Sequence, residues 1–351
     1  MTVAVLDAAR RLADEVLRPQ AEDVEMHGVP RAHLAALAGA GLFGVTAPAS
    51  YGGTDQPVPV MREIVEILAG ADASTWFVWT QHHTPVRTLV RGTNEALKER
   101  WLPRLAAGSA LAGVAFTHVR RPGPPAVRAE RADGGWRVGG DLAWLTSWGL
   151  ADVFLVGAVA GTDVVWVLLP LTEMDGVTAQ ALDLVAMRGT STVSVHLGDV
   201  SVADADVVLV EPLDDWRRTD AERTADVSPA VFGVTAECAR RLGDDHGFAA
   251  QLDDVRNRAY ALQDGSGPRA ERIAVRAEAH ALALRASAAL VAAGAGRSML
   301  AGNPAQRLAR EALFLLVQGQ DAEIRAAQIS ALSEEGSVKL DPAAPRFTEP
   351  S

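Results

Sequence analysis

The sequence predicts a protein of α+β class, mostly α, in which helices flank a β-rich centre. Alanine and leucine dominate both ends of the chain, and the middle is richer in valine, glycine and threonine. Alanine and leucine favour helices, whereas β-branched residues favour strands. The 351 residues suffice for two or three packed units. We therefore expect an N-terminal helical domain over 1–112, a central antiparallel β domain over 113–213, a C-terminal four-helix bundle over 214–335, and a frayed tail over 336–351.

Apolar residues recur at helical spacing through the first hundred positions. Leu6, Ala9 and Leu12 mark one face of the first helix. Asp72 stands where a carboxylate would cap the start of a later helix. The further helices that this spacing predicts lie near 34–42, 57–70, 72–90 and 94–107.

The hydrophobic period changes to that of strands after about residue 113. The segments GWRVGGDLAWLT, VFLVGAV, VVWVLLPL and TVSVHLGDVSV are short, rich in β-branched residues and separated by turn residues. In the last of them Val193, Val195 and Leu197 alternate with Ser194 and His196. This pattern predicts a strand with one buried face and places His196 on its polar face.

Helical periodicity returns beyond residue 215. It predicts four long helices that pack as a bundle. The segment 277–294 is apolar on more than one face, which predicts association into an oligomer. The four predicted helices lie near 221–243, 248–263, 267–293 and 304–333.

Composition excludes several classes of partner. The net charge is −11 and no run of lysine and arginine exceeds two residues, so nucleic acid is an improbable ligand. Cys238 is the single cysteine, which excludes internal disulfides and fits a reducing cytoplasm. No apolar run approaches the roughly 20 residues of a membrane helix. We therefore expect a cytoplasmic protein that does not bind membranes.

The motifs of several large enzyme classes are absent from the sequence. No G-x-G-x-x-G follows a predicted strand, and there is no phosphate-binding G-K-[ST] and no G-x-S-x-G elbow. His82 and His83 are adjacent and point to different sides of a helix, so we expect no metal site there. These observations disfavour classical nucleotide-binding folds, serine hydrolases and zinc enzymes.

Four motifs in an α–β–α order carry a resemblance to a known family. GVAFTHVRRPG opens the predicted β domain, GWRVGGDLAWLTSWGLADVFLV and MRGTST follow, and PAQRLAREALFLLVQGQDAEIR begins the last predicted helix. Together they resemble the acyl-CoA dehydrogenase superfamily over about residues 5–333. The residues that the resemblance places at a flavin are Phe116, Thr117, Trp144, Leu145 and Thr146.

The resemblance implies a cofactor, a reaction and partners. Trp144 would pack against the isoalloxazine ring of FAD, and Thr146 would hydrogen-bond near the N5 edge. The implied reaction is α,β-dehydrogenation of an acyl thioester, in which a base takes the α-proton and the flavin takes a hydride from the β-carbon. The implied partners are an electron-transfer protein and further copies of the chain in a homodimer or homotetramer.

The catalytic base is the main departure from the family pattern. Gln318 stands where relatives carry a glutamate, and a carboxamide cannot accept a proton near neutral pH. Three other residues are candidates for the base. His82 and His83 lie at the kink that Pro85 predicts in the helix over 72–90, and Glu222 lies in an AER segment similar to that of other relatives.

A second departure leaves other functions open. The segment THVRRPG replaces small residues of the family, and it offers the guanidinium groups of Arg120 and Arg121 either to a phosphate or to solvent. One alternative is a flavin-dependent monooxygenase of the same fold, which uses FMN supplied by a flavin reductase. Another is a flavin-free, non-catalytic paralogue. Gln318 and the altered segment favour these two alternatives, and Trp144 with Thr146 favours a bound flavin.

Overall fold

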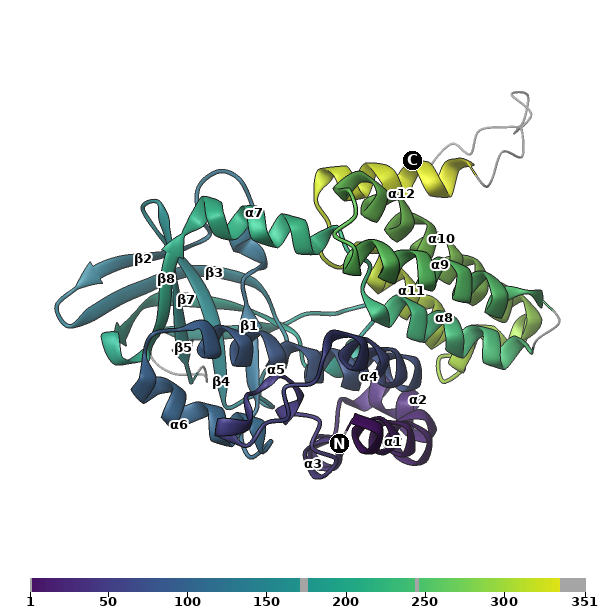
Figure 1. Cartoon of the computed structure of the whole chain (residues 1–351), viewed down its shortest axis with the longest axis horizontal. Coiled ribbons are helices and arrows are strands. Elements are labelled where there is room, and N and C mark those ends of the chain that lie inside the picture. The colour runs from purple at the N-terminus through teal and green to yellow at the C-terminus, as the bar shows by residue number, and fades with distance from the viewer. Residues whose placement is uncertain (1, 171–175, 244–245, 335–351) are drawn as a thin grey trace, which may run out of the picture.

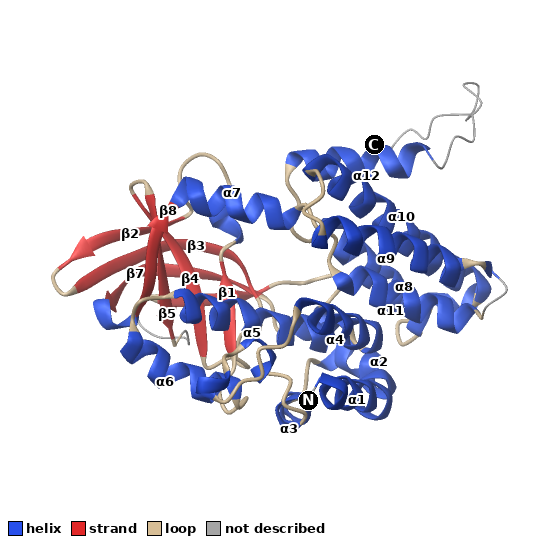
Figure 2. Ribbon diagram, viewed as in Figure 1, coloured by secondary structure: helices blue, strands red, loops and turns tan. Residues whose placement is uncertain are grey.

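The computed structural model describes residues 2–170, 176–243 and 246–334. Helices form both ends of the chain and strands form the middle (Figure 2). In Figure 1 the sheet lies on the left, the C-terminal helices lie on the right, and the N-terminal helices lie below and between them. The predicted α+β class is confirmed, whereas the tail expected over 336–351 lies outside the described residues.

The N-terminal helices share one apolar cluster with the C-terminal helices. A π-helical turn, Ala13–Leu17, joins the first two without a break. Asp72 caps α5 as predicted, because its carboxylate accepts hydrogen bonds from the N–H groups of Ser74 and Thr75. The bounds are α1 (Thr2–Leu12), α2 (Arg18–His27), α3 (Arg31–Gly39), α4 (Val58–Ala71), α5 (Ala73–Arg91) and α6 (Glu95–Ala106).

A single mixed sheet forms the centre. Its order is β6-β7-β3-β2-β4-β5-β8, and β1 pairs with β4. Among the described strands five pairings are antiparallel, as expected, but β1 and β2 both run parallel to β4. The parallel pairs arise because the chain leaves β1, forms the β2–β3 hairpin and returns to the same end of the sheet. The bounds are β1 (Ala112–Ala115), β2 (Val127–Ala132), β3 (Gly135–Leu145), β4 (Val153–Ala160), β5 (Asp163–Leu169), β6 (Val177–Ala181), β7 (Val193–Ala203) and β8 (Val207–Pro212).

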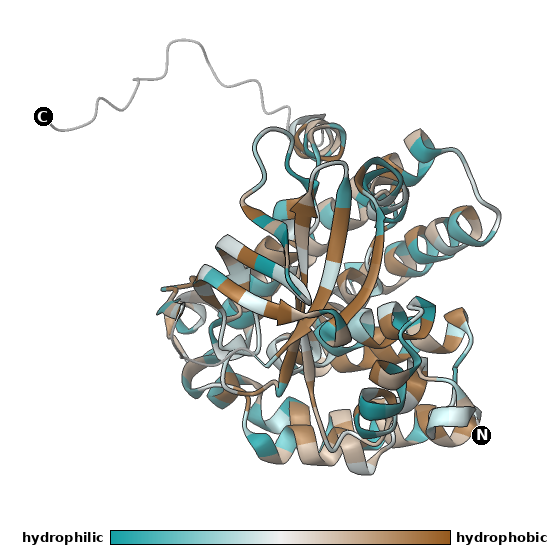
Figure 3. Ribbon diagram, turned by 90° about the vertical axis from the view of Figure 1, so that its left-hand side faces the viewer, coloured by the Kyte–Doolittle hydropathy of each residue, from teal (hydrophilic) through white to brown (hydrophobic). Residues whose placement is uncertain are grey.

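Burial explains the two kinds of strand sequence. β4 and β5 are covered on both faces, which accounts for their continuous apolar runs, and Figure 3 shows apolar residues along these central strands. β7 is covered on one face only, so Val193, Val195 and Leu197 are buried while His196 is exposed beside Asp141. The predicted one-sided strand is therefore confirmed.

The C-terminal part contains breaks that the sequence pattern does not predict. The helix expected over 221–243 is two helices, because Pro229 disfavours a helical conformation at Ser228, which instead caps the second one. The helix expected over 304–333 is also broken, because Gln318 adopts an extended conformation after Val317 and Gly319 follows with a φ of +62°. The bounds are α7 (Leu213–Thr224), α8 (Pro229–Leu242), α9 (Phe248–Asp264), α10 (Arg269–Ala293), α11 (Pro304–Val317) and α12 (Ala322–Glu334).

The helices α8 to α11 form the four-helix bundle, with α10 at its centre. α10 contacts α8, α9, α11 and α12, so the apolar faces of 277–294 are largely covered within one chain. That segment therefore does not by itself require an oligomer. Above the sheet α7 extends toward the bundle and bridges the two regions (Figure 1). Within the described ranges no helix is long and apolar enough to cross a membrane.

Candidate functional site

A cavity of about 1090 Å³ lies between the sheet and the C-terminal helices. Trp144 and Thr146 at the end of β3 form one wall, together with the loop over 184–192. Residues of α7 and of the α11–α12 corner, which we define as residues 318–321, form the opposite wall. The cavity thus joins segments that the sequence analysis associated with the flavin and with the missing base.

Strand alternation decides which residues at the end of β3 reach the cavity. Trp144 and Thr146 are two residues apart and share one face, and 49% of Trp144 is exposed. Leu145 points the other way and is fully buried in the core of the sheet. The expectation that the side chain of Leu145 faces a flavin is therefore wrong, because alternation turns it inward. Trp148 packs on Phe154 and is not among the residues that line the cavity.

The turn after β3 is held in an unusual backbone conformation. Ser147 has a φ of +72°, and Met187 and Ser191 in the facing loop have φ values of +59° and +50°. The N–H groups of Ser147 and Trp148 donate to the carbonyls of Thr190 and Ser191 at 3.0 Å. Three non-glycine residues in the left-handed region beside one cavity represent local strain, which often marks a functional site.

A chain of hydroxyl groups runs along the same wall. Thr146 Oγ1 lies 2.9 Å from Thr192 Oγ1, which lies 2.7 Å from Thr190 Oγ1. Thr190 Oγ1 in turn donates to the carbonyl of Met187 at 2.7 Å. All three threonines line the cavity, so a ligand beside Trp144 also contacts this polar edge.

The two arginines of the THVRRPG segment both line the cavity, but they differ in their partners. Arg120 forms a bidentate ion pair with Asp220 of α7, at 2.6 and 2.9 Å. It is therefore held in place rather than free for a phosphate. Arg217 donates to the carbonyls of Val119 and Arg121. The guanidinium of Arg121 lines the cavity without an ion-pair partner among the described residues, so it remains available to an anion.

Phe116 and Thr117 are the other two residues that the resemblance places at a flavin, and only one of them lines the cavity. Thr117 lines the cavity, and its assignment to a flavin stays a prediction. Phe116 instead packs edge to face against Trp166 and Trp216, and it is not part of the lining. Its side chain therefore supports the sheet behind the site, contrary to the expectation that it contacts the cofactor.

A buried arginine fixes the α11–α12 corner from behind. Arg276 of α10 is only 5% exposed, and it donates to the carbonyl of Thr224 and, at 2.7 Å, to that of Gln318. Burial lowers the pKa of Arg276 from its usual value to about 10. The buried guanidinium thus loses its hydration but donates hydrogen bonds to carbonyls at the ends of α7 and α11. These bonds hold Gln318 and Gly319 at the cavity.

Two further carbonyls near the end of α11 also have side-chain partners. His280 Nε2 lies 3.0 Å from the carbonyl of Leu315, and burial lowers the pKa of His280 to about 4. Gln320 and Gln328 both donate to the carbonyl of Leu316, at 2.9 and 3.0 Å. None of these contacts follows from sequence periodicity, so sequence reasoning missed them. Thr190 and Thr192, also missed, both lie within the quoted MRGTST motif.

The two histidine candidates for the base are not at the cavity. α5 continues without a break through Pro85, and it carries both imidazoles into the protein core. Burial lowers the pKa of His82 to about 3, and its Nδ1 accepts from the N–H of Ala112. Burial and the neighbouring His82 lower the pKa of His83, whose Nδ1 contacts Thr46 Oγ1 at 2.9 Å. The structure therefore places both imidazoles away from the cavity lining.

Glu222 is also separated from the cavity. It lies on the exposed side of α7 and pairs with Arg272. Among the described residues that line the cavity none is a histidine, and its two carboxylates are both ion-paired. Asp220 binds Arg120, and Asp321 binds Arg269 at 2.6 Å. The described lining thus offers Gln318 but no unpaired base.

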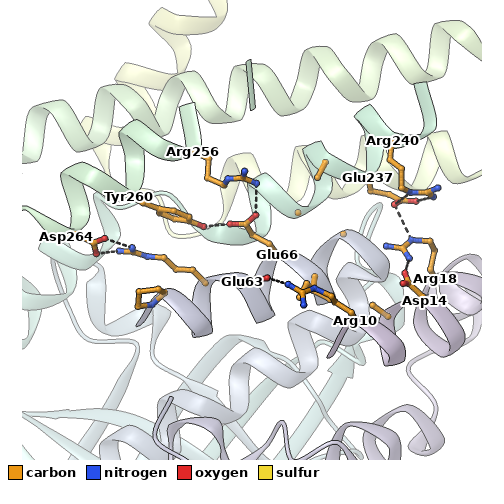
Figure 4. A pocket seen from close by; sticks show the side chains of 17 residues that line it. Arg10, Asp14, Arg18, Glu63, Glu66, Glu237, Arg240, Arg256, Tyr260 and Asp264 are labelled. Atoms are coloured by element: carbon orange, nitrogen blue, oxygen red, sulfur yellow. Dashed lines mark hydrogen bonds and ion pairs between the residues drawn. The ribbon is translucent and has the colours of Figure 1, made fainter. Parts of the chain in front are cut away.

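A second hollow, of about 620 Å³, lies between the N-terminal helices and the bundle (Figure 4). Each of its arginines is paired with a carboxylate, and Tyr260 donates to Glu66 at 2.6 Å. These pairs join α1 to α4, α2 to α8 and α4 to α9, so we interpret the hollow as a structural interface. The pairs are Arg10–Glu63, Arg18–Glu237, Arg62–Asp264, Arg240–Glu237 and Arg256–Glu66.

Comparison with known sequences finds relatives of one family. The model of the acyl-CoA dehydrogenase N-terminal domain matches residues 2–109. Mitochondrial 2-methylacyl-CoA dehydrogenase of Solanum tuberosum is 30% identical over 201 residues, which cover 53% of this chain and 48% of that protein. A probable acyl-CoA dehydrogenase of Mycobacterium leprae is 31% identical over 159 residues, or 44% of this chain and 41% of the relative. The aligned region thus spans about half the length of the curated relatives.

Solved structures share the fold over nearly the whole chain. The complex of glutaryl-CoA dehydrogenase with glutaryl-CoA has a TM-score of 0.80 at 17% identity, with 95% of each chain covered. Butyryl-CoA dehydrogenase of Megasphaera elsdenii has a TM-score of 0.77 at 18% identity, covering 95% of this chain and 97% of that one. Dibenzothiophene monooxygenase of a Paenibacillus species has a TM-score of 0.74 at 20% identity, covering 94% and 96%.

Proposed function

The chain belongs to the acyl-CoA dehydrogenase superfamily, and from this premise we propose that it is a flavin-dependent oxidoreductase. The observation that carries the proposal is the half-exposed ring of Trp144 beside the hydroxyl of Thr146 in a large cavity. An isoalloxazine has a broad aromatic face and hydrogen-bonding edges, and these two side chains complement both. The residues present therefore fit a flavin.

Five cavity residues have roles in this proposal. Trp144 packs against the ring, and Thr146 binds its polar edge. Arg121 and Arg325, which line the cavity without ion-pair partners in the described structure, bind the anionic part of the cofactor or substrate. Gln318 presents a carboxamide to the substrate side. A bound flavin, which we propose to be FAD, supplies the capacity to accept or donate two electrons.

The first candidate reaction is α,β-dehydrogenation of an acyl thioester. It is supported by the names of the curated relatives and by the matched N-terminal domain. The reaction needs a base for the α-proton, and a well-placed base contributes roughly 10²- to 10⁴-fold. Gln318 cannot provide it. Since His82, His83 and Glu222 lie outside the lining, any of them would have to act only after a rearrangement.

The second candidate reaction is monooxygenation by a reduced flavin. The absence of an unpaired base among the described lining residues favours it, because reduced flavin and O₂ can oxygenate a substrate without removing an α-proton. A monooxygenase also shares the fold. In this case NAD(P)H, through a flavin reductase, supplies the electrons, and the flavin is FMN or FAD.

One experiment separates these reactions. Purified protein is loaded with FAD, and flavin bleaching is followed with a panel of acyl-CoA thioesters in wild type and Gln318→Glu. Dehydrogenation predicts bleaching that Gln318→Glu increases at least tenfold. If no thioester reduces the flavin in either protein while NAD(P)H and a reductase do, the monooxygenase reaction is supported. If neither FAD nor FMN binds, the flavin proposal is wrong and the non-catalytic alternative remains.

We also propose that the chain works as a homodimer or homotetramer. The support is now a different surface from the one predicted. Leu313 and Val317 of α11, which also line the cavity, and Ile329 of α12 are more than half exposed, and an apolar patch on adjoining helices is typical of a surface that contacts another subunit. Light scattering at micromolar concentration that gave the mass of one chain would contradict this proposal.

A further inference from the structure

We propose that Thr190, Thr192 and Thr146 form a one-way chain of hydrogen bonds that makes Thr146 an acceptor toward the cavity, so that the site binds reduced flavin more tightly than oxidised flavin. The inference rests on the proposed flavin function. Thr190 and Thr192 are positioning residues in it, because they act on the ligand through Thr146.

Counting hydrogens sets the direction of the chain. A threonine hydroxyl has one hydrogen to donate. Thr190 is fully buried and gives its hydrogen to the carbonyl of Met187 at 2.7 Å. Its oxygen can then only accept from Thr192, at 2.7 Å. Thr192 has thereby used its own hydrogen, so it accepts from Thr146 at 2.9 Å.

The outcome is that Thr146 directs lone pairs, and no hydrogen, at a ligand beside it. The reverse direction would turn three hydroxyls together and give up the bond to the carbonyl of Met187, which is costly because Met187 and Thr190 are both buried. The preference is therefore built into the wall of the cavity before any ligand binds.

Flavin chemistry gives this polarity a consequence. The N5 atom of oxidised flavin carries a lone pair and no hydrogen. Addition of a hydride, which brings two electrons and one proton, creates an N–H group at N5. An acceptor oxygen beside N5 repels the first form and hydrogen-bonds to the second. A hydrogen bond of ordinary net strength changes a dissociation constant roughly threefold to tenfold.

The test measures dissociation constants for FAD in both oxidation states. Oxidised FAD is titrated by fluorescence quenching, and dithionite-reduced FAD is titrated anaerobically by absorbance. Wild type is compared with Thr146→Val, Thr192→Val and Thr192→Ser. Thr235→Val is the matched control, because Thr235 is a buried threonine of α8 that donates to the carbonyl of Val231 outside the cavity.

The two valine variants should act on opposite forms of the cofactor. Thr192→Val releases the hydrogen of Thr146, so oxidised FAD should bind roughly threefold to tenfold more tightly with little change for reduced FAD. Thr146→Val removes the acceptor, so reduced FAD should bind roughly threefold to tenfold more weakly. Thr192→Ser and Thr235→Val should keep the wild-type ratio. A tenfold change in the ratio lowers or raises the two-electron potential by about 30 mV.

Three results would overturn the inference in different ways. Equal effects of Thr192→Val on both oxidation states, in protein shown by circular dichroism to be folded, would show that the chain has no direction. Failure of wild type to bind either form of FAD or FMN would overturn the proposed function together with the inference. If wild type binds FAD saturably but the ratio of the two dissociation constants is the same in wild type and in both valine variants, the inference is overturned and the proposed function stands.

Discussion

Replacing Glu311 by glutamine should change how stability depends on pH. Glu311 of α11 is 1% exposed, and it lies near the buried carboxylates of Glu25 and Asp72 around one buried arginine, Arg307. Burial raises the pKa of Glu311 from 4.5 to about 7, although Arg307 bonds to it at 2.6 Å. The pKa values of Glu25 and Asp72 are also raised by burial. The ionised glutamate is therefore a cost to the folded state.

The sign and size of the effect follow from linkage. Below about pH 4.5 Glu311 is protonated in both states and costs nothing. Between pH 4.5 and 7 the unfolded chain ionises first, so stability falls as the pH rises. One pKa unit is about 1.36 kcal/mol, and the full cost by pH 8 is at most about 3.4 kcal/mol. In the variant Arg307 keeps its ion pair with Glu22 at 3.1 Å, so its charge is still compensated. We therefore expect Glu311→Gln to raise the free energy of unfolding by about 1–3 kcal/mol at pH 8 and by almost nothing at pH 5.

Urea unfolding of wild type and Glu311→Gln at pH 5, 6, 7 and 8 measures this directly. The difference in unfolding free energy should grow with pH in favour of the variant. Glu278→Gln is a suitable control, because Glu278 is exposed on α10 and pairs with an exposed Arg258. A difference that stays constant from pH 5 to 8, or that favours wild type more at pH 8, would refute the reasoning.

Three further substitutions test the site and its frame. Arg276→Met should leave the carbonyl of Gln318 without a donor and weaken FAD binding at least threefold, as measured by fluorescence titration, while urea unfolding changes by less than about 3 kcal/mol because burial of the guanidinium is also relieved. Trp144→Ala should abolish most FAD binding in the same titration, and thermal unfolding should show a smaller loss than for a buried tryptophan, because half of this side chain is already exposed. Gly233→Ala should lower the unfolding free energy by about 1–3 kcal/mol in urea, because its Cβ would stand 2.2 Å from the carbonyl oxygen of Glu66 where α8 crosses α4.

Local patterns predicted the parts of the fold that local chemistry determines. The alternation of Val193, Val195 and Leu197 identified a one-sided strand, and Asp72 identified a helix start, because each depends on neighbours in sequence. The family resemblance, rather than a local pattern, placed Trp144 and Thr146 beside one ligand, and the structure puts both in the lining of one cavity. It erred for Leu145, although period-two alternation alone would have excluded that side chain.

Other features depend on contacts between distant segments, and they leave no periodic trace. His82 and His83 look like catalytic side chains in sequence, yet α5 is covered on both sides and buries them. Gly319 reads as one glycine within a helical pattern, yet α11 ends at Val317 and the chain turns through an extended Gln318 and a left-handed Gly319. The donors from Arg276 and His280 to this end come from another helix and could not be inferred.

The contacts of the α11–α12 corner indicate that the site is built for a ligand. Arg276 is buried beside it without a carboxylate at ion-pair distance among the described residues, and burial lowers its pKa to about 10, so its presence costs stability. What the side chain achieves is to hold Gln318 at the cavity. Chains commonly break a local rule of this kind where function requires it. Arg276 therefore fixes the backbone of the α11–α12 corner at a cost in stability, and this cost is explained if the corner positions Gln318 for a ligand in the cavity.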